Sequence, residues 1–516
     1  MTLVAVPIEV EEPNEVASAL EDANLAKVGG ADLVEFRVDV LAEHPEGVSA
    51  ARQLVRESPL PVVLTCRSEA EGGSWRGEET DRVSFLEAVG TDDLAPQFLD
   101  FEEAVWSRSA NIRQKVRLVV AHDQQVRPDR SRLVLSKHDF DGRPTDLTSR
   151  VAAMAVDADV VKVAWTARSL RDCLEAFEMP RLLGVPTVAL CMGPFGLPSR
   201  VLAPKFGGFL TFAALDAASA TAPGQPTLSE LIHQYRFRSI DSNTEVYGVA
   251  GWPVEHSKSP AFHNQIFSEQ QRNAVYLPLP VAPDATAFVA TLESWLAHPG
   301  LDLRGLSVTL PHKETLASFV QECGGCCDEA VELSGAANTL RVDDSGNLHA
   351  SNTDVLAIEE ALAARIDLQG QSALVLGAGG VARAATAALL RLGAQVRVMN
   401  RTSARAEQLA SSFGTSVEVV TTPGEVSAVV QCTSVGMSGG PDPKGTPIDP
   451  AILPRDAVLL ETVYEPVMTP LREAFATSGG QTIGGLEMFQ RQAAAQCRLW
   501  TGREPGPAAL AVLDDS

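Results

Sequence analysis

Positive charge is scarce in this sequence. The chain carries 42 lysines and arginines against 66 aspartates and glutamates, which gives a formal net charge of −24 at pH 7. A surface this acidic repels nucleic acid and anionic membranes, so neither is expected as a partner. It also repels small anions, so a site for an anionic substrate must supply its own arginines and lysines.

Long apolar runs are absent as well. No run reaches the roughly 18 residues of a membrane-spanning helix, and the opening segment Met1–Val6 is strand-like and lacks the basic residues of a secretory signal. The eight cysteines are scattered, which predicts reduced thiols in a cytoplasmic protein. Their one cluster, Cys323–Cys327, has no second pair, so we expect a turn or core role there and no metal site.

Apolar sequence is otherwise plentiful. Hydrophobic residues make up 45% of the chain, and its length of 516 residues predicts about three structural units. Residues 1–225 contain eight apolar runs with helix-like stretches between many of them, the pattern of a closed (β/α)8 barrel. A ninth run, Leu118–Ala121, is interpreted as a helix end or a short extra strand. The eight runs are Leu3–Ile8, Leu33–Asp39, Val62–Arg67, Phe98–Glu102, Leu133–His138, Val160–Trp165, Val185–Cys191 and Phe209–Phe212.

The run Val160–Trp165 contains one lysine in an otherwise apolar strand. Lys162 lies between valines, and a buried ammonium tends to lose its proton. The neutral amine is the form that attacks a ketone to make a Schiff base; the alternative is a lysine at a strand end that reaches solvent. His138 ends the preceding run, at the barrel end where active sites form, and histidine is the usual proton shuttle near neutral pH.

Further charged residues stand at the ends of the predicted strands, and a ring of salt bridges would explain some of them. Arg200 follows a loop shaped by glycine and proline, and its guanidinium suits a substrate carboxylate. A class I aldolase would use the same lysine chemistry, but His138 with Arg200 favours elimination from a small keto acid. The other charged strand ends are Glu35, Arg37, Arg67, Glu71, Asp100 and Glu102.

Five motifs, in order, resemble type I 3-dehydroquinate dehydratases over nearly all of residues 1–225. They are Val34–Arg37, Ser136–Phe140, Val161–Val163, Ser199–Arg200 and Ala222–Gln225. The resemblance implies that Lys162 forms an imine with the substrate ketone and that His138 removes the adjacent proton and assists loss of the hydroxyl. Glu71 would orient His138, and Arg200 would hold the carboxylate. The remaining implied contacts are Glu35, Arg37, Arg67, Gln225 and Thr221, where the family often has serine.

The second half contains a dinucleotide-binding pattern. A strand, Ala373–Leu376, leads into G-x-G-x-x-A at the start of a helix, where backbone amides face a pyrophosphate. After the next strand, Arg401 replaces the acid typical of NAD enzymes, with Arg405 nearby, and a guanidinium suits a 2′-phosphate. NADPH is therefore the expected cofactor, although Arg405 has the alternative of facing solvent. The expected contacts are Gly377, Ala378, Gly379, Gly380, Val381, Ala382, Asn400, Arg401 and Thr402.

Small polar side chains precede and follow this pattern. They are suited to a polyol, but helix capping and turns also use such residues constantly. Together they resemble shikimate dehydrogenases over residues 246–502. The resemblance implies Lys313 and Asp354 as the catalytic pair, with two departures, Ser307 for asparagine and Glu461 for aspartate. Its implied substrate contacts are Ser257, Ser259, Thr309, Asn338 and Gln492, and its implied nicotinamide contacts are Thr433, Ser434, Tyr464 and Gly485.

Both resemblances in one chain imply a bifunctional enzyme of aromatic biosynthesis. It would dehydrate 3-dehydroquinate to 3-dehydroshikimate and reduce that product with NADPH to shikimate. Alternatives are a preference for quinate, which Ser307 leaves open, and a catalytically dead sensor. The expected fold is α/β, with an N-terminal TIM barrel (1–225), a linker (226–243), an α/β substrate domain (244–355) completed by the C-terminal helix (484–516), and a Rossmann NADP domain (356–483).

Overall fold

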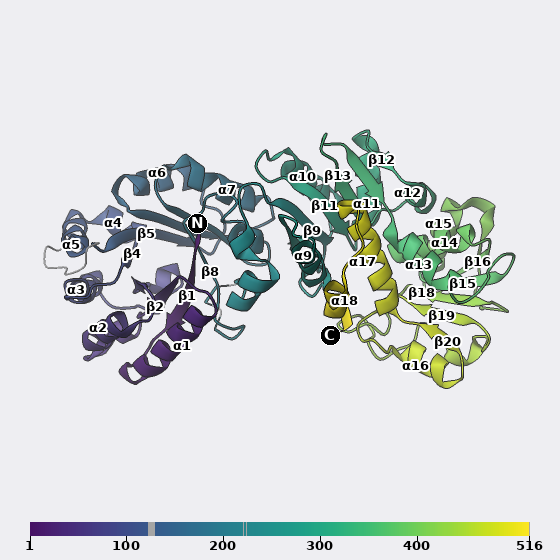
Figure 1. Cartoon of the computed structure of the whole chain (residues 1–516), viewed down its shortest axis with the longest axis horizontal. Helices are drawn as coiled ribbons and strands as arrows, with labels where there is room; N and C mark the ends of the chain where they lie inside the picture. Colours follow the sequence, from purple (N-terminus) through teal and green to yellow (C-terminus); the bar gives the residue numbers. More distant parts are fainter. Residues whose placement is uncertain (122–129, 220, 223, 515–516) are drawn as a thin grey trace. The chain divides into compact units, whose positions relative to one another are not determined.

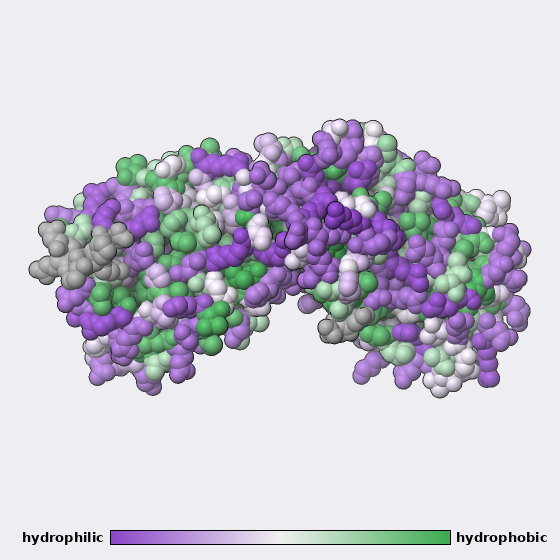
Figure 2. Space-filling model, in the orientation of Figure 1, coloured by the Kyte–Doolittle hydropathy of each residue, from purple (hydrophilic) through white to green (hydrophobic). Residues whose placement is uncertain are grey.

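The computed structural model describes residues 1–121, 130–219, 221–222 and 224–514. Pro223, which belongs to one of the motifs above, lies outside the described residues. Residues 1–245, 273–279 and 294–302 form one compact unit, and residues 246–272, 280–293 and 303–516 form a second. Hydrophilic residues cover much of the surface in view, with apolar patches between them (Figure 2). No described helix has both the length and the apolar character needed to cross a membrane.

The first unit contains the predicted barrel. Its strands run in the order β7-β6-β5-β4-β3-β2-β1-β8, and every pairing along this order is parallel. A hydrogen bond of 2.8 Å from Phe209 N to Thr187 O links the two end strands. The strands are β1 (Leu3–Glu9), β2 (Leu33–Arg37), β3 (Val62–Thr65), β4 (Phe98–Glu102), β5 (Arg132–Asp139), β6 (Val160–Thr166), β7 (Thr187–Met192) and β8 (Leu210–Phe212).

Helices follow the strands and lie around the barrel (Figure 1). The run Leu118–Ala121 is the end of a helix rather than a strand, because α5 continues to Val120. Beyond β8, residues Glu230–Gln234 form a short π-helix. The barrel helices are α1 (Val16–Val28), α2 (Gly47–Glu57), α3 (Glu79–Gly90), α4 (Glu103–Arg108), α5 (Ala110–Val120), α6 (Leu147–Asp157), α7 (Asp172–Leu182) and α8 (Leu197–Val201).

The barrel interior changes from apolar to polar along the strands. An apolar layer with a residue from every strand, including Leu33, Phe98 and Val160, fills one end. Side chains on one face of a strand recur every second residue, so the next inward positions lie two residues further on. On five strands these next positions are polar and buried, and the layer so formed is the floor of a site: Glu35, Thr65, Asp100, Ser136 and Lys162.

The second unit begins with a mixed sheet. Strand β11 pairs parallel to β9 and antiparallel to β13, which pairs antiparallel to β14, and β14 pairs parallel to β12. The strands are β9 (Glu245–Gly251), β11 (Leu303–Val308), β12 (Cys326–Cys327), β13 (Thr339–Val342) and β14 (Leu348–Ser351); β10 is Ala274–Pro280. The helices here are α9 (Ser259–Glu269), α10 (Ala285–Ala297), α11 (Lys313–Glu322) and α12 (Glu329–Ser334).

A parallel sheet follows, in the doubly wound order β17-β16-β15-β18-β19-β20. Helices α13, α14 and α15 cover one face and α16 the other (Figure 1). The order in which strands are added to the sheet reverses between β15 and β18, and this switch point is where such sheets bind dinucleotides. The elements are α13 (Thr353–Ala363), β15 (Ser372–Leu376), α14 (Gly380–Arg391), β16 (Gln395–Met399), α15 (Ser403–Ser412), β17 (Val417–Val419), β18 (Ala428–Gln431), β19 (Val458–Glu461), α16 (Pro470–Thr477) and β20 (Gln481–Ile483).

The last long helix, α17 (Gly485–Thr501), packs on the mixed sheet. Trp500 Nε1 donates a hydrogen bond of 3.0 Å to Leu340 O on β13, and Gly305 on β11 leaves room for the indole, because a Cβ there would lie 2.5 Å from Trp500 Nε1. A short helix, α18 (Pro507–Asp514), follows.

Candidate active sites

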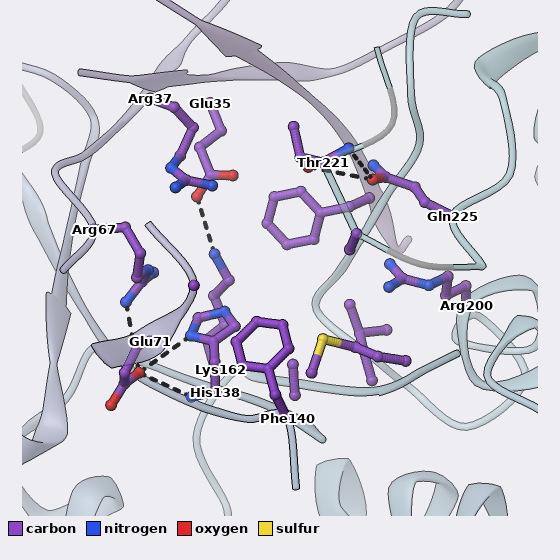
Figure 3. Close-up of a pocket in the computed structure, with 16 residues that line it drawn as sticks. Glu35, Arg37, Arg67, Glu71, His138, Phe140, Lys162, Arg200, Thr221 and Gln225 are labelled. Atoms are coloured by element: carbon purple, nitrogen blue, oxygen red, sulfur yellow. Dashed lines mark hydrogen bonds and ion pairs between the residues drawn. The ribbon is translucent and has the colours of Figure 1, made fainter. Parts of the chain in front are cut away.

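The structure brings the nine predicted barrel residues together around one cavity (Figure 3). Period-two alternation carries the side chains of β2, β5 and β6 inward, and the loops after β3, β7 and β8 supply the rest. Phe140, Met192 and Phe212 add apolar lining. The nine residues are Glu35, Arg37, Arg67, Glu71, His138, Lys162, Arg200, Thr221 and Gln225.

Lys162 lies at the floor of this cavity and is 7% exposed. Its Nζ donates hydrogen bonds of 3.0 Å to Glu35 Oε1 and to Asp100 Oδ2. The ammonium also lies 4.5 Å from the centre of the Phe212 ring. The lysine is thus buried as predicted, but it has two carboxylate partners.

The two carboxylates beside Lys162 have shifted pKa values of their own. Burial alone would raise the pKa of Glu35, but the Lys162 ammonium holds it below its ordinary value. Burial acts on Asp100 in the same way, and Arg67 and then Lys162 hold its pKa well below the ordinary value. Lys162 therefore has two carboxylate partners in the cavity that the sequence did not predict. The sequence of β6 alone does not reveal partners that come from β2 and β4.

His138 is held by Glu71. Glu71 Oε2 accepts a hydrogen bond of 2.9 Å from His138 N and lies 3.3 Å from His138 Nδ1. Lys137 Nζ donates to the other carboxylate oxygen at 3.1 Å. Burial, with Arg67 and Lys162 nearby, holds the pKa of His138 well below its ordinary value. The imidazole is therefore neutral near pH 7, the state that a base requires.

The three arginines of the cavity differ in their partners. Arg67 donates to Asp100 Oδ1 and Ser136 Oγ, both at 2.8 Å, and Arg37 pairs with Asp39 at 2.5 Å. Arg200 is 2% exposed, and within the described residues it has no ion pair and its Nε has no hydrogen-bond acceptor. Burial lowers its pKa to about 10. Arg200 is thus a buried cation that lacks an anion, as a carboxylate-binding residue should be.

The loop after β8 presents Thr221 and Gln225 to the cavity (Figure 3). Gln225 Oε1 accepts hydrogen bonds from Thr221 N at 3.2 Å and from Thr221 Oγ1 at 3.3 Å. Gln225 Nε2 is buried and has no acceptor among the described residues. The amide therefore has a donor available for a ligand.

The second unit contains the predicted lysine–aspartate pair. Lys313 begins α11 and Asp354 lies in the first turn of α13, and Lys313 Nζ donates to Asp354 Oδ2 at 2.5 Å. Both residues are buried, at 7% and 6% exposure. Gly380, at the start of α14, lies beside the lysine, because a Cβ on it would be 3.3 Å from Lys313 Cδ. The pair and the glycine turn therefore meet in one place.

Two of the predicted polyol contacts, Asn338 and Gln492, lie beside Thr353, the residue before Asp354. Asn338 Oδ1 accepts from Thr353 N at 2.9 Å and from Thr353 Oγ1 at 3.1 Å, next to Asp354 in the chain. Gln492 Oε1 lies 3.5 Å from the same hydroxyl. Ser257 Oγ accepts from Ser259 N at 3.3 Å, which is turn chemistry.

Ser307 lies in β11 and Thr309 directly follows it, and the two side chains have different neighbours. A Cβ on Gly251 would lie 2.4 Å from Thr309 Cγ2, so the glycine lets Thr309 approach the end of β9. Ser307 Oγ donates to Gln496 Oε1 on α17 at 2.9 Å. Ser307, where the family pattern has asparagine, therefore links β11 to α17.

The glycine turn after β15 has the backbone geometry of a phosphate loop. Gly377 has φ +117°, and a Cβ there would lie 3.1 Å from Cys432 O. Gly379 has open space at its Cβ position, and Gly380 begins α14, whose free amides favour an anion.

The remaining predicted cofactor contacts surround the switch point. Arg401 is exposed after β16, beside Asn400, whose Nδ2 donates to Thr402 O at 2.9 Å. Thr433 and Ser434 follow β18, and Tyr464 packs on Phe489, with ring centres 5.1 Å apart. Gly485 lies against the loop after β19, because a Cβ there would be 2.1 Å from Val463 O.

Some residues that the sites use were not predicted to have a role there. Asp100 was noted only as a charged strand end, and Ser136, Thr65 and Lys137 were not assigned to the site. The two-residue repeat of inward-facing side chains along a strand could have identified the floor residues, because each lies two positions after an apolar inward residue. No described group of three or more His, Cys, Asp and Glu residues has the arrangement of a metal site.

Four family models match successive parts of the chain. Type I 3-dehydroquinase matches residues 4–242, and the shikimate dehydrogenase substrate binding domain matches 249–340. Shikimate / quinate 5-dehydrogenase matches 359–434, and the shikimate 5′-dehydrogenase C-terminal domain matches 485–509.

Individual relatives agree with these matches. Shikimate dehydrogenase (NADP(+)) of Caulobacter vibrioides is 35% identical over 51% of this chain and 91% of its own length. The crystal structure of shikimate 5-dehydrogenase from Thermus thermophilus, in complex with NADP(H) and shikimate, is 32% identical, with a TM-score of 0.46, over 53% of this chain and 99% of that one. The chloroplastic bifunctional 3-dehydroquinate dehydratase/shikimate dehydrogenase of Arabidopsis thaliana is 36% identical over 93% of this chain and 79% of its own length. The chain therefore belongs to the bifunctional 3-dehydroquinate dehydratase/shikimate dehydrogenase family of the shikimate pathway.

Proposed function

We propose that Lys162, His138 and Arg200 dehydrate 3-dehydroquinate in the barrel and that Lys313 and Asp354 serve NADPH-dependent reduction of the product, 3-dehydroshikimate. The observation that carries the barrel assignment is the buried Arg200, which has no ion pair among the described residues and lines the same cavity as Lys162 and a neutral His138. The net negative charge of the chain disfavours small anions at its surface, whereas the guanidinium of Arg200 gives the cavity a local positive charge for one carboxylate.

The first step of the dehydration is carried by Lys162. Its ammonium must lose a proton, and the carboxylates of Glu35 and Asp100 lie 3.0 Å away to accept it. The amine then attacks the ketone carbon, and loss of water leaves an iminium. The iminium draws electrons from the neighbouring carbon and so acidifies its C–H bond.

His138 carries the proton steps. With hydrogen on Nδ1 facing Glu71, the Nε2 lone pair is left for the acidified C–H bond. The same nitrogen, once protonated, gives its proton to the departing hydroxyl, which leaves as water. Hydrolysis of the iminium then releases the product and restores Lys162.

In the second unit, Lys313 stabilises the oxygen of the ketone as it gains negative charge. Its charge is held by Asp354 at 2.5 Å, which also fixes the ammonium in place. Asn338 and Gln492 lie close enough to Thr353 to surround a ring bound beside the pair.

The residues present fit NADPH. The glycine turn at Gly377–Gly380 leaves a backbone cradle that a side chain would fill, and α14 begins there. Arg401 is exposed after β16 and suits a 2′-phosphate. NADPH bound there would supply the hydride for the ketone carbon.

Two assays on the full chain test this function separately. Borohydride reduction in the presence of 3-dehydroquinate should fix a substrate-sized mass on the peptide that contains Lys162. The matched variant Lys162→Met should carry no adduct and should keep reduction of 3-dehydroshikimate. An adduct on another lysine, or none on the wild type, would refute the barrel assignment.

We further propose a cytoplasmic location, without a nucleic-acid or membrane partner. The net charge of −24 and the eight cysteines, all free thiols, support this assignment. Fractionation of the source cells tests it, and activity in an organelle fraction would contradict it.

A further inference from the structure

Two buried side chains end neighbouring strands of the Rossmann sheet. Gln431 ends β18 and Glu461 ends β19; they pair in register, and both are 0% exposed. Gln431 accepts from Thr433 N at 2.8 Å and donates to the carbonyls of Thr433 and Val435 at 3.1 and 3.2 Å. The amide thereby fixes the loop after β18, which contains two of the expected nicotinamide contacts.

Glu461 performs the corresponding task for the loop after β19. Its Oε1 accepts from Val463 N at 3.0 Å, and its Oε2 accepts from Thr469 Oγ1 at 2.7 Å. Thr469 is the N-cap of α16 and accepts from Arg472 N at 3.3 Å. One carboxylate therefore ties both ends of residues 462–469, and Tyr464 lies between the two attachment points.

The two loops are also joined to each other. Ser438 N donates to Glu465 O at 2.9 Å, so a change in residues 462–469 reaches the loop after β18. A side chain that fixes one loop thus stabilises a surface made by both.

We propose that Glu461 is a positioning residue for the reduction: its ionised carboxylate holds residues 462–469 in the conformation that binds the nicotinamide half of NADPH. The inference rests on the proposed reductase function and assigns this carboxylate no contact with the reacting atoms.

The surroundings of Glu461 make its hydrogen bonds to residues 462–469 sensitive to pH. Burial raises the pKa of Glu461 to about 7, although the hydrogen bonds from Thr469 and Val463, and Arg472 on α16, act to lower it. On the β18 side it faces the thiol of Cys432, whose own pKa is raised by burial and then by Glu461 and Asp354. The charge of Lys313 acts to lower the pKa of the same thiol. On the loop of residues 462–469, burial and then Glu465 raise the pKa of Tyr464.

The direction follows from the hydrogen bonds that Thr469 and Val463 donate to the carboxylate: they lower its pKa, so they are stronger to the ionised form than to the protonated one. The folded-state pKa lies above the ordinary value of 4.5, so the carboxyl is protonated below about pH 7 and ionised above it. Protonation removes an acceptor from one of the two oxygens, so the loop is held less firmly as the pH falls. NADPH affinity should fall with it.

The test is NADPH binding to the full chain, followed by nicotinamide fluorescence on both sides of pH 7. Glu461→Gln has the same shape but no charge and one acceptor oxygen. Above pH 7 its Kd for NADPH should exceed that of the wild type by about tenfold, the loss of one charge-assisted hydrogen bond. Below pH 7 the two Kd values should converge. Dehydratase activity of the same sample should be unchanged and reports an intact barrel.

A ratio of the two Kd values that is constant with pH, or a Kd equal to that of the wild type throughout, would overturn the inference. If Glu461→Gln does not fold, Thr469→Val decides: it removes a hydrogen bond that lowers the pKa of Glu461, so the pH at which NADPH affinity falls must move upward. An unmoved transition would overturn the inference equally. A wild-type chain that binds NADPH but never reduces 3-dehydroshikimate would instead refute the reductase function.

Discussion

Arg200 provides a prediction in which stability and activity change in opposite directions. The guanidinium is 2% exposed, and no carboxylate of the described residues pairs with it. Burial lowers its pKa to about 10, a change that corresponds to about 3 kcal/mol against the charged form in the free protein. Because the folded-state pKa is depressed, this penalty is present at every pH below about 10.

The perturbation is Arg200→Met, which keeps an apolar stem in the cavity wall and removes the charge. The unfolding free energy of the barrel should stay equal or rise, by at most about 3 kcal/mol. Two charge-assisted hydrogen bonds to a carboxylate are worth about 1.5–3 kcal/mol each. Dehydratase kcat/KM should therefore fall by about 10²–10⁴-fold.

Both quantities are measured on the same preparation, by denaturant unfolding and by dehydratase kinetics. Reduction of 3-dehydroshikimate is the internal control and should be unchanged. Arg200→Lys keeps the charge without the bidentate geometry and should lose less activity. The reasoning would be refuted if Arg200→Met lost several kcal/mol of stability while kcat/KM stayed near the wild-type value, because Arg200 would then be a structural residue.

Three further predictions concern single residues of the two sites. Lys313→Ala should abolish reduction, assayed with 3-dehydroshikimate and NADPH, and leave dehydration intact; loss of both activities would count against separate sites. Because burial holds the pKa of His138 well below 6.5, dehydratase kcat/KM should stay level as the pH falls through that value, and a decline centred there would contradict a neutral base. Arg401→Ala should raise the Kd for NADPH by about 10–100-fold, with little change for NADH; equal losses for both would remove the 2′-phosphate assignment.

The strands of the barrel followed from apolar runs, because burial on both faces leaves a direct trace in sequence. The predicted run Leu133–His138 corresponds to β5 (Arg132–Asp139), and Phe209–Phe212 corresponds to β8 (Leu210–Phe212). The fold class is confirmed by the sheets of the structure and the family by the comparisons. The domain limits and the roles of single residues stay predictions.

What the sequence did not contain was the pairing of charges across the barrel. Lys162 and Asp100 are 62 residues apart in the chain and meet only because both point inward. The Ser307 hydroxyl could likewise not be placed, because its partner, Gln496, lies 189 residues away on α17. Contacts of this kind depend on the closed fold and leave no local pattern.

The most direct test of the account is to give the purified chain NADPH and 3-dehydroquinate alone and to follow NADPH oxidation. The account predicts oxidation by the wild type and none by Lys162→Met, with activity of that variant restored by 3-dehydroshikimate. No oxidation by the wild type, or undiminished oxidation by Lys162→Met, would contradict the claim that this chain performs both reactions in sequence.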